Sequence, residues 1–178
     1  MQPGMSNAEK RSVSPPFNWP GEPFHVALVE PDIPVNAGNI MRLCAATGSV
    51  LHLVEPLGFR LTEKHLKRAA VDGWERVCLQ RHRSIGEFLA ASATRRKFLF
   101  TRRGVHRHHD VRYQVGDMLV FGSETRGLPP DLLEEMSEMT VAIPIMEGTV
   151  RCLNLSSAVA VALYEALRQV AGRTQNAV

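Results

Sequence analysis

The chain has few cysteines and no long apolar run, and each shortage excludes a class of protein. Cys44, Cys78 and Cys152 lie far apart and form no paired spacing, which argues against a disulfide framework or a zinc module. No apolar run approaches the roughly 20 residues that span a bilayer. Residues 1–23 lack the charged-then-apolar order of a signal peptide. We therefore expect a soluble cytoplasmic protein that does not bind membranes.

Length and composition indicate one globular domain. The chain has 178 residues, of which 44% are hydrophobic and 22% charged, and its net charge is only +3. Residues 1–23 are rich in Pro, Ser, Gly and Asn and show no hydrophobic period, which is typical of a disordered or loosely packed extension. We expect a single domain over residues 24–172 and a frayed tail over 173–178.

Strand-like and helix-like segments alternate along this domain. Short apolar runs predict six strands, over residues 25–30, 50–55, 76–80, 97–101, 117–122 and 140–145. Periodic segments predict helices over residues 39–48, 62–70, 84–93, 129–136 and 155–170. Continuous apolar strands between helices favour an α/β fold, in which helices cover both faces of a mostly parallel six-stranded sheet.

The loop after the first strand, "EPDIPVNAGN", precedes the first helix. It has neither the G-x-G-x-x-G of a dinucleotide fold nor the Lys-Ser/Thr of a P-loop. We expect a turn in which Asn36 or Asn39 caps the helix, with Arg42 early in that helix. A cation there opposes the helix macrodipole. Arg42 is therefore either a solvated helix residue or a functional one.

Two further loops are unusual. In "FGSETRGLPP", Gly122 allows close approach of a ligand, Glu124 accepts hydrogen bonds and Arg126 supplies a cationic fork. In "IPIMEGTVRCLNLSSAV", Asn154 or Ser156 can cap the last helix, and backbone groups over residues 143–153 can bind an adenine edge. The simpler alternatives are a capped surface turn and an ordinary strand-to-helix loop.

Taken together, the three loops resemble the motifs of the SPOUT, or trefoil-knot, methyltransferase superfamily. "NAGNIMR" resembles the first motif, "FGSETRGL" the second and "IPI…NLSSAVAVALYE" the third. "VEPDIPVNAGNIMRLCAATG", "LHLVEPLGF", "LKRAAVD" and "LYEALRQ" are similar to the TrmL branch, which methylates the wobble-nucleotide ribose 2′-oxygen of tRNA. The resemblance covers residues 24 to about 172.

The resemblance implies a C-terminal trefoil knot, a homodimer and S-adenosylmethionine as the cofactor, with no metal. It places the reacting ribose near Arg42, Asn154, Ser156 and Tyr164, although two caps and a core tyrosine are the ordinary alternatives for the last three. The positions that it assigns to the cofactor are Phe100, Gly122, Glu124, Ile143, Cys152 and Leu153.

The family assigns activation of the ribose hydroxyl to Arg42, and two accounts of that role stay open. Arg42 either becomes neutral and acts as a base, or stays charged, holds a phosphate and stabilises the developing alkoxide. A guanidinium is normally always protonated, which favours the second account.

A local basic segment over residues 94–112 indicates an RNA-binding surface, with a solvated surface as the alternative. The same segment holds His106, His108, His109 and Asp110, which we interpret as a polar loop because their spacing matches no closed zinc set. The cations assigned to RNA binding are Arg42, Arg95, Arg96, Arg102, Arg103, Arg107 and Arg126, with Lys97 and Arg112 in the same segment and a smaller cluster at Lys64, Lys67 and Arg68.

The leading hypothesis is therefore methyl transfer to the ribose 2′-hydroxyl of the tRNA wobble nucleotide, position 34, within the anticodon stem-loop. The same chemistry at another tRNA or rRNA position is the nearest rival. An RNA chaperone that binds the cofactor without turnover, and a flavodoxin-like protein, are rivals from other classes.

Overall fold

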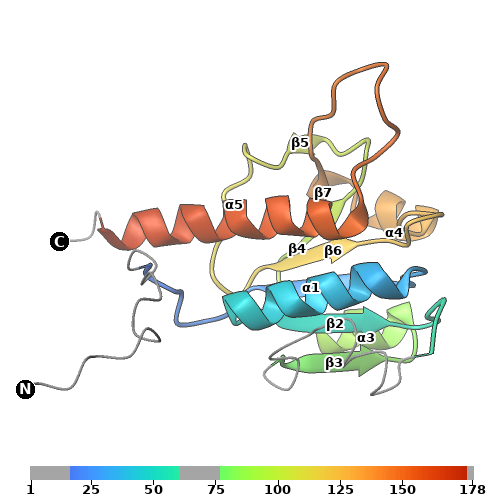
Figure 1. Ribbon diagram of the computed structural model, residues 1–178, viewed down its shortest axis with the longest axis horizontal. Helices are drawn as coiled ribbons and strands as arrows, with labels where there is room; N and C mark the ends of the chain where they lie inside the picture. The colour runs from blue at the N-terminus through green and yellow to red at the C-terminus, as the bar shows by residue number, and fades with distance from the viewer. Residues whose placement is uncertain (1–16, 61–76, 176–178) are drawn as a thin grey trace, which may run out of the picture.

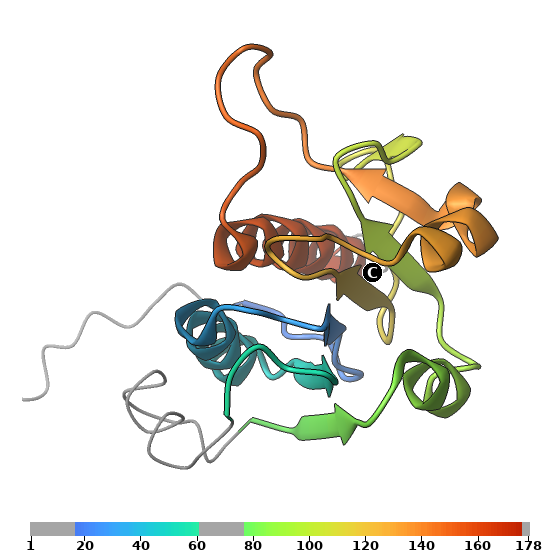
Figure 2. The same ribbon diagram turned by 90° about the vertical axis from the view of Figure 1, so that its right-hand side faces the viewer.

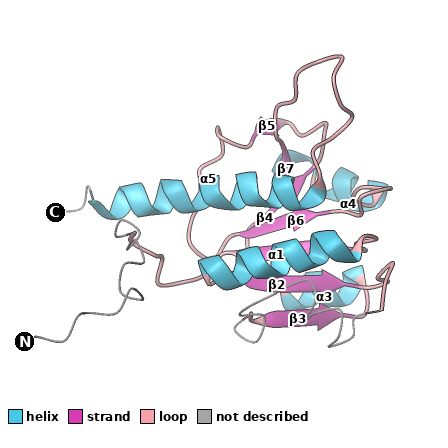
Figure 3. Cartoon of the chain, in the orientation of Figure 1, coloured by secondary structure: helices cyan, strands magenta, loops and turns pink. Residues whose placement is uncertain are grey.

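The computed structural model describes residues 17–60 and 77–175, whose strands form one parallel sheet (Figure 1). The sheet order is β3-β2-β1-β6-β4-β7-β5, and every pair of neighbouring strands is parallel. Helices lie between many of these strands along the chain, whereas β4, β5 and β6 follow one another without a helix (Figure 3). The strands are β1 (His25–Val29), β2 (Val50–Val54), β3 (Leu79–His82), β4 (Lys97–Phe100), β5 (His106–Arg107), β6 (Met118–Phe121) and β7 (Thr140–Ala142).

Helices cover both faces of the sheet, as expected for continuous apolar strands. Helices α1 (Pro34–Thr47) and α5 (Leu155–Gln175) pack side by side on one face, and α3 (Ile85–Ala91) and α4 (Pro130–Glu135) lie on the other (Figure 2). Alternate residues of β1 belong to the cores on opposite faces of the sheet. Val26 and Leu28 lie in the core with α1 and α5, whereas Ala27 and Val29 lie in the core with α3 and α4. The α/β fold is therefore confirmed.

The strand count is seven rather than the predicted six. All six predicted strands are present, and the additional one is β5, whose two exposed residues pair with β7. Two residues, one of them charged, carry no apolar signal, so the sequence pattern does not reveal this edge strand. The C-terminal trefoil knot stays a prediction.

Helix α1 begins earlier than predicted. It starts at Pro34, and its N-cap residue, Ile33, makes no side-chain capping bond. Proline is favourable in the first helical turn, because its missing N–H has no partner there anyway. Asn36 and Asn39 therefore lie inside the helix and are not caps. Arg42 lies about two turns after the start, where the macrodipole has little effect, so the expected conflict does not arise.

The other helix ends follow ordinary rules. Ser84 caps α3 by accepting a bond from the Glu87 N–H. Helix α5 continues to Gln175, so its backbone includes the first residues of the predicted tail. The predicted helix over residues 62–70, its cations Lys64, Lys67 and Arg68, and residues 1–16 of the predicted extension lie outside the described residues. None of the helices described is long and apolar enough to cross a bilayer.

Three buried histidines form a line across three neighbouring strands. His25 Nδ1 lies 2.8 Å from His52 Nε2, and His52 Nδ1 lies 3.0 Å from His82 Nε2. The Phe88 ring of α3 packs edge-on against the rings of His52 and His82. Burial is the main cause that lowers the pKa of His25 to about 4 and that of His52 to about 3. Both imidazoles are therefore neutral near pH 7, as part of the α3-side core.

Candidate functional site

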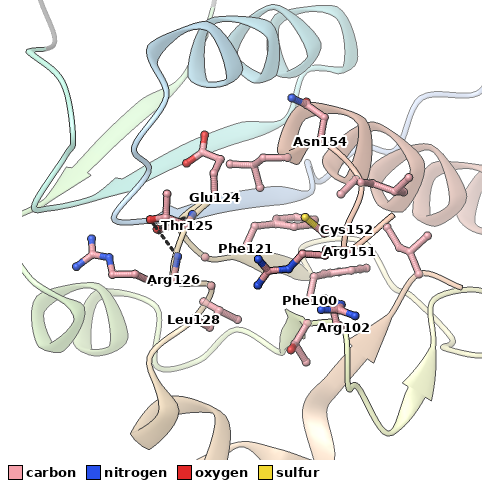
Figure 4. A pocket seen from close by; sticks show the side chains of 18 of the residues that line it. Phe100, Arg102, Phe121, Glu124, Thr125, Arg126, Leu128, Arg151, Cys152 and Asn154 are labelled. Carbon is pink, nitrogen blue, oxygen red and sulfur yellow. Dashed lines mark hydrogen bonds between the residues drawn. The ribbon is translucent and has the colours of Figure 1, made fainter. Parts of the chain in front are cut away.

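A cavity of about 910 Å³ lies at the carboxyl ends of β1, β4, β6 and β7, where ligands bind in open α/β sheets. All three loops selected from the sequence contribute to its walls (Figure 4). The loop between β7 and α5 stands away from the sheet (Figure 2). The lining includes every residue predicted to contact the cofactor: Phe100, Gly122, Glu124, Ile143, Cys152 and Leu153.

Aromatic rings and a close backbone crossing shape one wall of the cavity. Phe100 and Phe121, at the ends of adjacent strands, stack with ring centroids 4.6 Å apart. A Cβ atom at Gly122 would lie 2.1 Å from the Gly127 carbonyl carbon, so no larger residue fits there. The Gly127 N–H donates to the Ser123 carbonyl at 2.9 Å, which closes the loop back on itself.

Glu124 joins this loop to the start of α1. Its carboxylate accepts bonds from the Asp32 N–H at 2.8 Å, the Ile33 N–H at 3.3 Å and the Asn36 side-chain amide at 2.8 Å. Two of these donors are backbone groups beside the helix N-terminus, where a carboxylate is favoured. Glu124 therefore fixes, from a distant loop, the backbone just before α1 and the Asn36 side chain in its first turn.

The same bonds continue to α5. Asn36 Oδ1 accepts from the Asn154 side-chain amide at 2.9 Å, and Asn154 Oδ1 accepts from the N–H and the hydroxyl of Ser156. The Asn154 side chain thus caps the first turn of α5, as one alternative from the sequence proposed. Glu124, Asn36, Asn154 and Ser156 form one polar chain, hereafter the motif network, which links all three loops.

A second set of contacts fixes the outer part of the loop after β6. The Asp32 carboxylate accepts from the hydroxyls of Ser123 and Thr125, and these bonds, that of Thr125 first, lower its pKa. Arg126 lies 3.1 Å from the Glu30 carboxylate and 3.8 Å from that of Asp32. Arg126, predicted to bind RNA, is therefore already balanced by two acids of its own chain.

Three other arginines line the cavity without such partners. Arg102 and Arg103 follow β4, and Arg151 lies in the loop before α5. All three are exposed, and within the described part of the chain none forms an ion pair. Figure 4 shows Arg151 extending across the cavity near Phe100, whereas Arg126 points away from it. The sequence interpretation singled out Arg102 and Arg103 but missed Arg151.

The rest of the basic segment is divided between paired and free cations. Arg95 donates to the Glu22 carboxylate and the Gly116 carbonyl, both at 3.2 Å. Arg96 pairs with the buried Asp117 carboxylate at 3.0 Å. Lys97, expected to be exposed, is instead buried, and its ammonium donates to backbone carbonyls of the α3–β4 connection. Arg107 on β5 is exposed.

Two residues assigned to catalysis lie outside the cavity. Arg42 on α1 is exposed and is not among the lining residues. Tyr164 on α5 is 50% exposed, so the alternative of a core tyrosine is wrong. By contrast, Asn154 lines the cavity, and the Ser156 hydroxyl donates a hydrogen bond to the Asn154 side chain. The cavity of one chain thus contains only part of the predicted catalytic set.

The histidines of the basic segment make separate contacts. His106 Nε2 lies 3.1 Å from the Glu138 carbonyl, and His109 Nε2 lies 3.7 Å from the Asp110 carboxylate. Over the described ranges, no group of three His, Cys, Asp or Glu side chains could hold a metal ion.

Comparison with known proteins gives the site a family. The model of the SpoU rRNA methylase family matches residues 23–164. The chain belongs to this family. It is 50% identical over 149 residues to a tRNA (cytidine(34)-2′-O)-methyltransferase of Burkholderia ambifaria, covering 82% of this chain and 95% of that protein. A protein of the same name from Escherichia coli is 46% identical over 148 residues, covering 83% and 94%.

Solved structures of methyltransferases have the same fold. One, described as giving structural insights into the 2-OH methylation of C/U34 on tRNA, has a TM-score of 0.80 and 47% identity, covering 85% of this chain and 99% of that one. The SpoU methyltransferase AviRb from Streptomyces viridochromogenes, in complex with AdoMet, has a TM-score of 0.71 and 26% identity, covering 84% and 58%. The resemblance drawn from the three motifs is confirmed.

Proposed function

We propose that the protein transfers a methyl group from S-adenosylmethionine to the ribose 2′-hydroxyl of the tRNA wobble nucleotide, a cytidine or uridine at position 34. The motif network carries the proposal, because it brings the three family loops to one cavity at the carboxyl ends of the strands. The names of the relatives that match nearly their whole length support the choice of nucleotide.

The cavity residues fit S-adenosylmethionine. Gly122 lets the loop after β6 close on itself at the cavity wall, because any Cβ there would meet Gly127. The apolar side chains of Phe121, Ile143 and Leu153 provide contacts for a flat purine. When bound, the cofactor supplies a methyl group on a sulfonium sulfur for in-line transfer to an oxygen. The role of the protein is to align donor and acceptor, and the motif network keeps the loops that do so in register.

For Arg42 we propose the role of a charged clamp. Its guanidinium is exposed and no acid of the described chain pairs with it. A guanidinium has several N–H donors and a positive charge, which suit it to hold an RNA phosphate and stabilise the developing alkoxide. Arg42→Ala should abolish methylation and leave cofactor affinity nearly unchanged. Equal loss of both would mean that Arg42 has a structural role.

We also propose that the enzyme acts as a homodimer on the anticodon stem-loop. Arg42 and Tyr164 project from α1 and α5, outside the cavity of their own chain. In a homodimer whose second copy faces these helices, Arg42 and Tyr164 of one chain would reach the cavity of the other chain. Mixing Arg42→Ala with a cavity variant, Gly122→Val, should then restore part of the activity that each lacks alone. No restoration in a mixture verified to contain heterodimers would refute a shared site.

The deciding experiment is methyl labelling of tRNA with mapping of the modified nucleotide. The purified protein should place one methyl group on the ribose at position 34 of tRNA isolated from cells that lack the protein. Such tRNA carries its other modifications, so a missing prior modification cannot explain a negative result. A methyl group on the ribose of another tRNA or rRNA nucleotide would support the rival position and refute this one.

A further inference from the structure

The acids and the cations of the cavity lie on different sides and differ in their partners. Glu30, Asp32 and Glu124 lie beside the start of α1, and each is bonded to Arg126, to hydroxyls or to backbone N–H groups. Arg102, Arg103 and Arg151 line the β4 and β7 side, where no described acid pairs with them. Figure 4 shows Arg102 and Arg151 apart from Glu124 and Arg126. These three, hereafter the free arginines, leave positive charge that no acid of residues 17–60 and 77–175 balances.

The proposed cofactor cannot balance this charge. S-Adenosylmethionine carries a sulfonium, an ammonium and a carboxylate, so its net charge is one positive. Its demethylated product has lost the sulfonium charge and is neutral overall. Like charges in one cavity repel, and only the RNA phosphates among the expected ligands are anions in excess.

We infer that the free arginines couple the two substrates: RNA phosphates neutralise Arg102, Arg103 and Arg151, so RNA and the cationic cofactor each strengthen the binding of the other. This inference rests on the proposed function. Coupling of this kind is reciprocal, because a change in one affinity requires the same change in the other. It also means that, without RNA, the cavity favours the neutral product over the cationic cofactor. Arg151 thereby gains a role that the sequence motifs did not suggest.

The size of the effect follows from Coulomb's law. One unit charge about 8 Å from another in water changes an affinity by roughly twofold, and three such charges, partly screened by salt, give about three- to tenfold.

Calorimetry with two ligands tests the coupling without turnover. Sinefungin carries a charged amine in place of the methylsulfonium, and S-adenosylhomocysteine is neutral at the same position. With the full-length protein at pH 7, saturating anticodon stem-loop RNA should tighten sinefungin binding about three- to tenfold and change S-adenosylhomocysteine binding by less than about twofold. Without RNA, raising salt from about 50 to about 300 mM should tighten sinefungin binding only.

Variants identify the arginines responsible. Arg151→Gln should tighten sinefungin binding in the absence of RNA, weaken RNA binding and reduce the coupling. Arg83→Gln is the matched control, because Arg83 is an exposed arginine beside α3 and outside the cavity. Its backbone N–H donates to the Glu87 carboxylate, which the substitution leaves in place, and its guanidinium pairs with no acid in the described part of the chain. It should leave all these affinities unchanged.

Three results would overturn the inference. Equal effects of RNA on both ligands would exclude a charge mechanism. Equal weakening of both ligands by Arg151→Gln would mean that Arg151 holds the carboxylate they share. Unchanged coupling in Arg151→Gln and in the double Arg102→Gln, Arg103→Gln variant would exclude these side chains. In each case methylation at position 34 would persist, so the proposed function would stand; absence of methylation on any RNA would instead refute the proposed function.

Discussion

Replacing Glu124 by glutamine tests whether the motif network holds α1 and the cavity loops together. The carboxylate accepts three bonds, two of them from backbone N–H groups at the start of α1. Glutamine keeps one oxygen acceptor but brings an NH₂ group toward the donors and removes the charge that favours the helix N-terminus. A hydrogen bond to a charged group contributes about 1.5–3 kcal/mol, and Glu124 is only half-buried. We therefore expect the free energy of unfolding to fall by about 1–3 kcal/mol.

Urea denaturation followed by circular dichroism measures this change, with an unchanged m-value as evidence that the denatured state is the same. Glu87→Gln is the control, because Glu87 is an exposed carboxylate that accepts one backbone bond at the start of α3. It should cost less than about 1 kcal/mol. Glu124→Gln and Asn36→Ala should be non-additive by at least about 0.5 kcal/mol, since the side chains share a bond. Two results together would refute the network as a structural unit: a loss of unfolding free energy in Glu124→Gln no larger than that in Glu87→Gln, and additive losses for Glu124→Gln and Asn36→Ala.

Five further outcomes are expected. The folded-state pKa values of His25 and His52, about 4 and about 3, lie below the unfolded value of 6.5, so their stabilising effect is complete above pH 6.5. It should decrease as pH falls below 6.5, by about 1.4 kcal/mol per pH unit for each histidine; urea midpoints that do not change between pH 7 and pH 5 would contradict this. Gly122→Ala should weaken S-adenosylhomocysteine binding at least about tenfold in calorimetry, because its Cβ meets backbone. Gly21→Ala, with nothing within 4 Å of its Cβ, should have no effect. Lys97→Met should leave tRNA affinity unchanged in a filter-binding assay, because Lys97 is buried, whereas Arg103→Gln should weaken it.

Much of the fold could be predicted from apolar patterns alone. Runs such as 97–101 and 117–122 are continuous because both faces of a parallel strand are covered. The pattern could not reveal β5, which is two residues long and exposed. It also placed Lys97 on the surface, as one cation of the basic segment over residues 94–112 that was interpreted as an RNA-binding surface. Its ammonium is instead held by backbone carbonyls in the core, a partnership that no sequence spacing specifies.

The site was predicted as a set of loops but not as a set of contacts. Each motif was visible because its residues are adjacent in sequence. Glu124 and Asn36, however, are 88 residues apart, and Asn154 and Asn36 are 118 apart. Side-chain bonds over such separations depend on the sheet order, which places the loop after β6 beside that after β1. For the same reason the sequence did not indicate a binding role for Arg151, which has no other cation near it in its loop. Its position beside Arg102 and Arg103 in the cavity lining became evident only from the structure.

The line of buried histidines has a consequence for proton positions. A neutral imidazole carries one N–H, and each of the two bonds in the line needs one donor and one acceptor. If His82 Nε2 donates to His52 Nδ1, His52 must donate from Nε2 to His25; if His25 donates from Nδ1, the whole order reverses. The tautomer of one histidine in the line therefore fixes the tautomers of the others. Within the described part of the chain, the buried His25 Nε2 has no hydrogen-bond partner, so the line ends there either in an N–H without an acceptor or in a lone pair without a donor. In the first case a buried donor is unsatisfied and the donors run from β3 to β1; in the second a buried acceptor is unsatisfied and the donors run from β1 to β3.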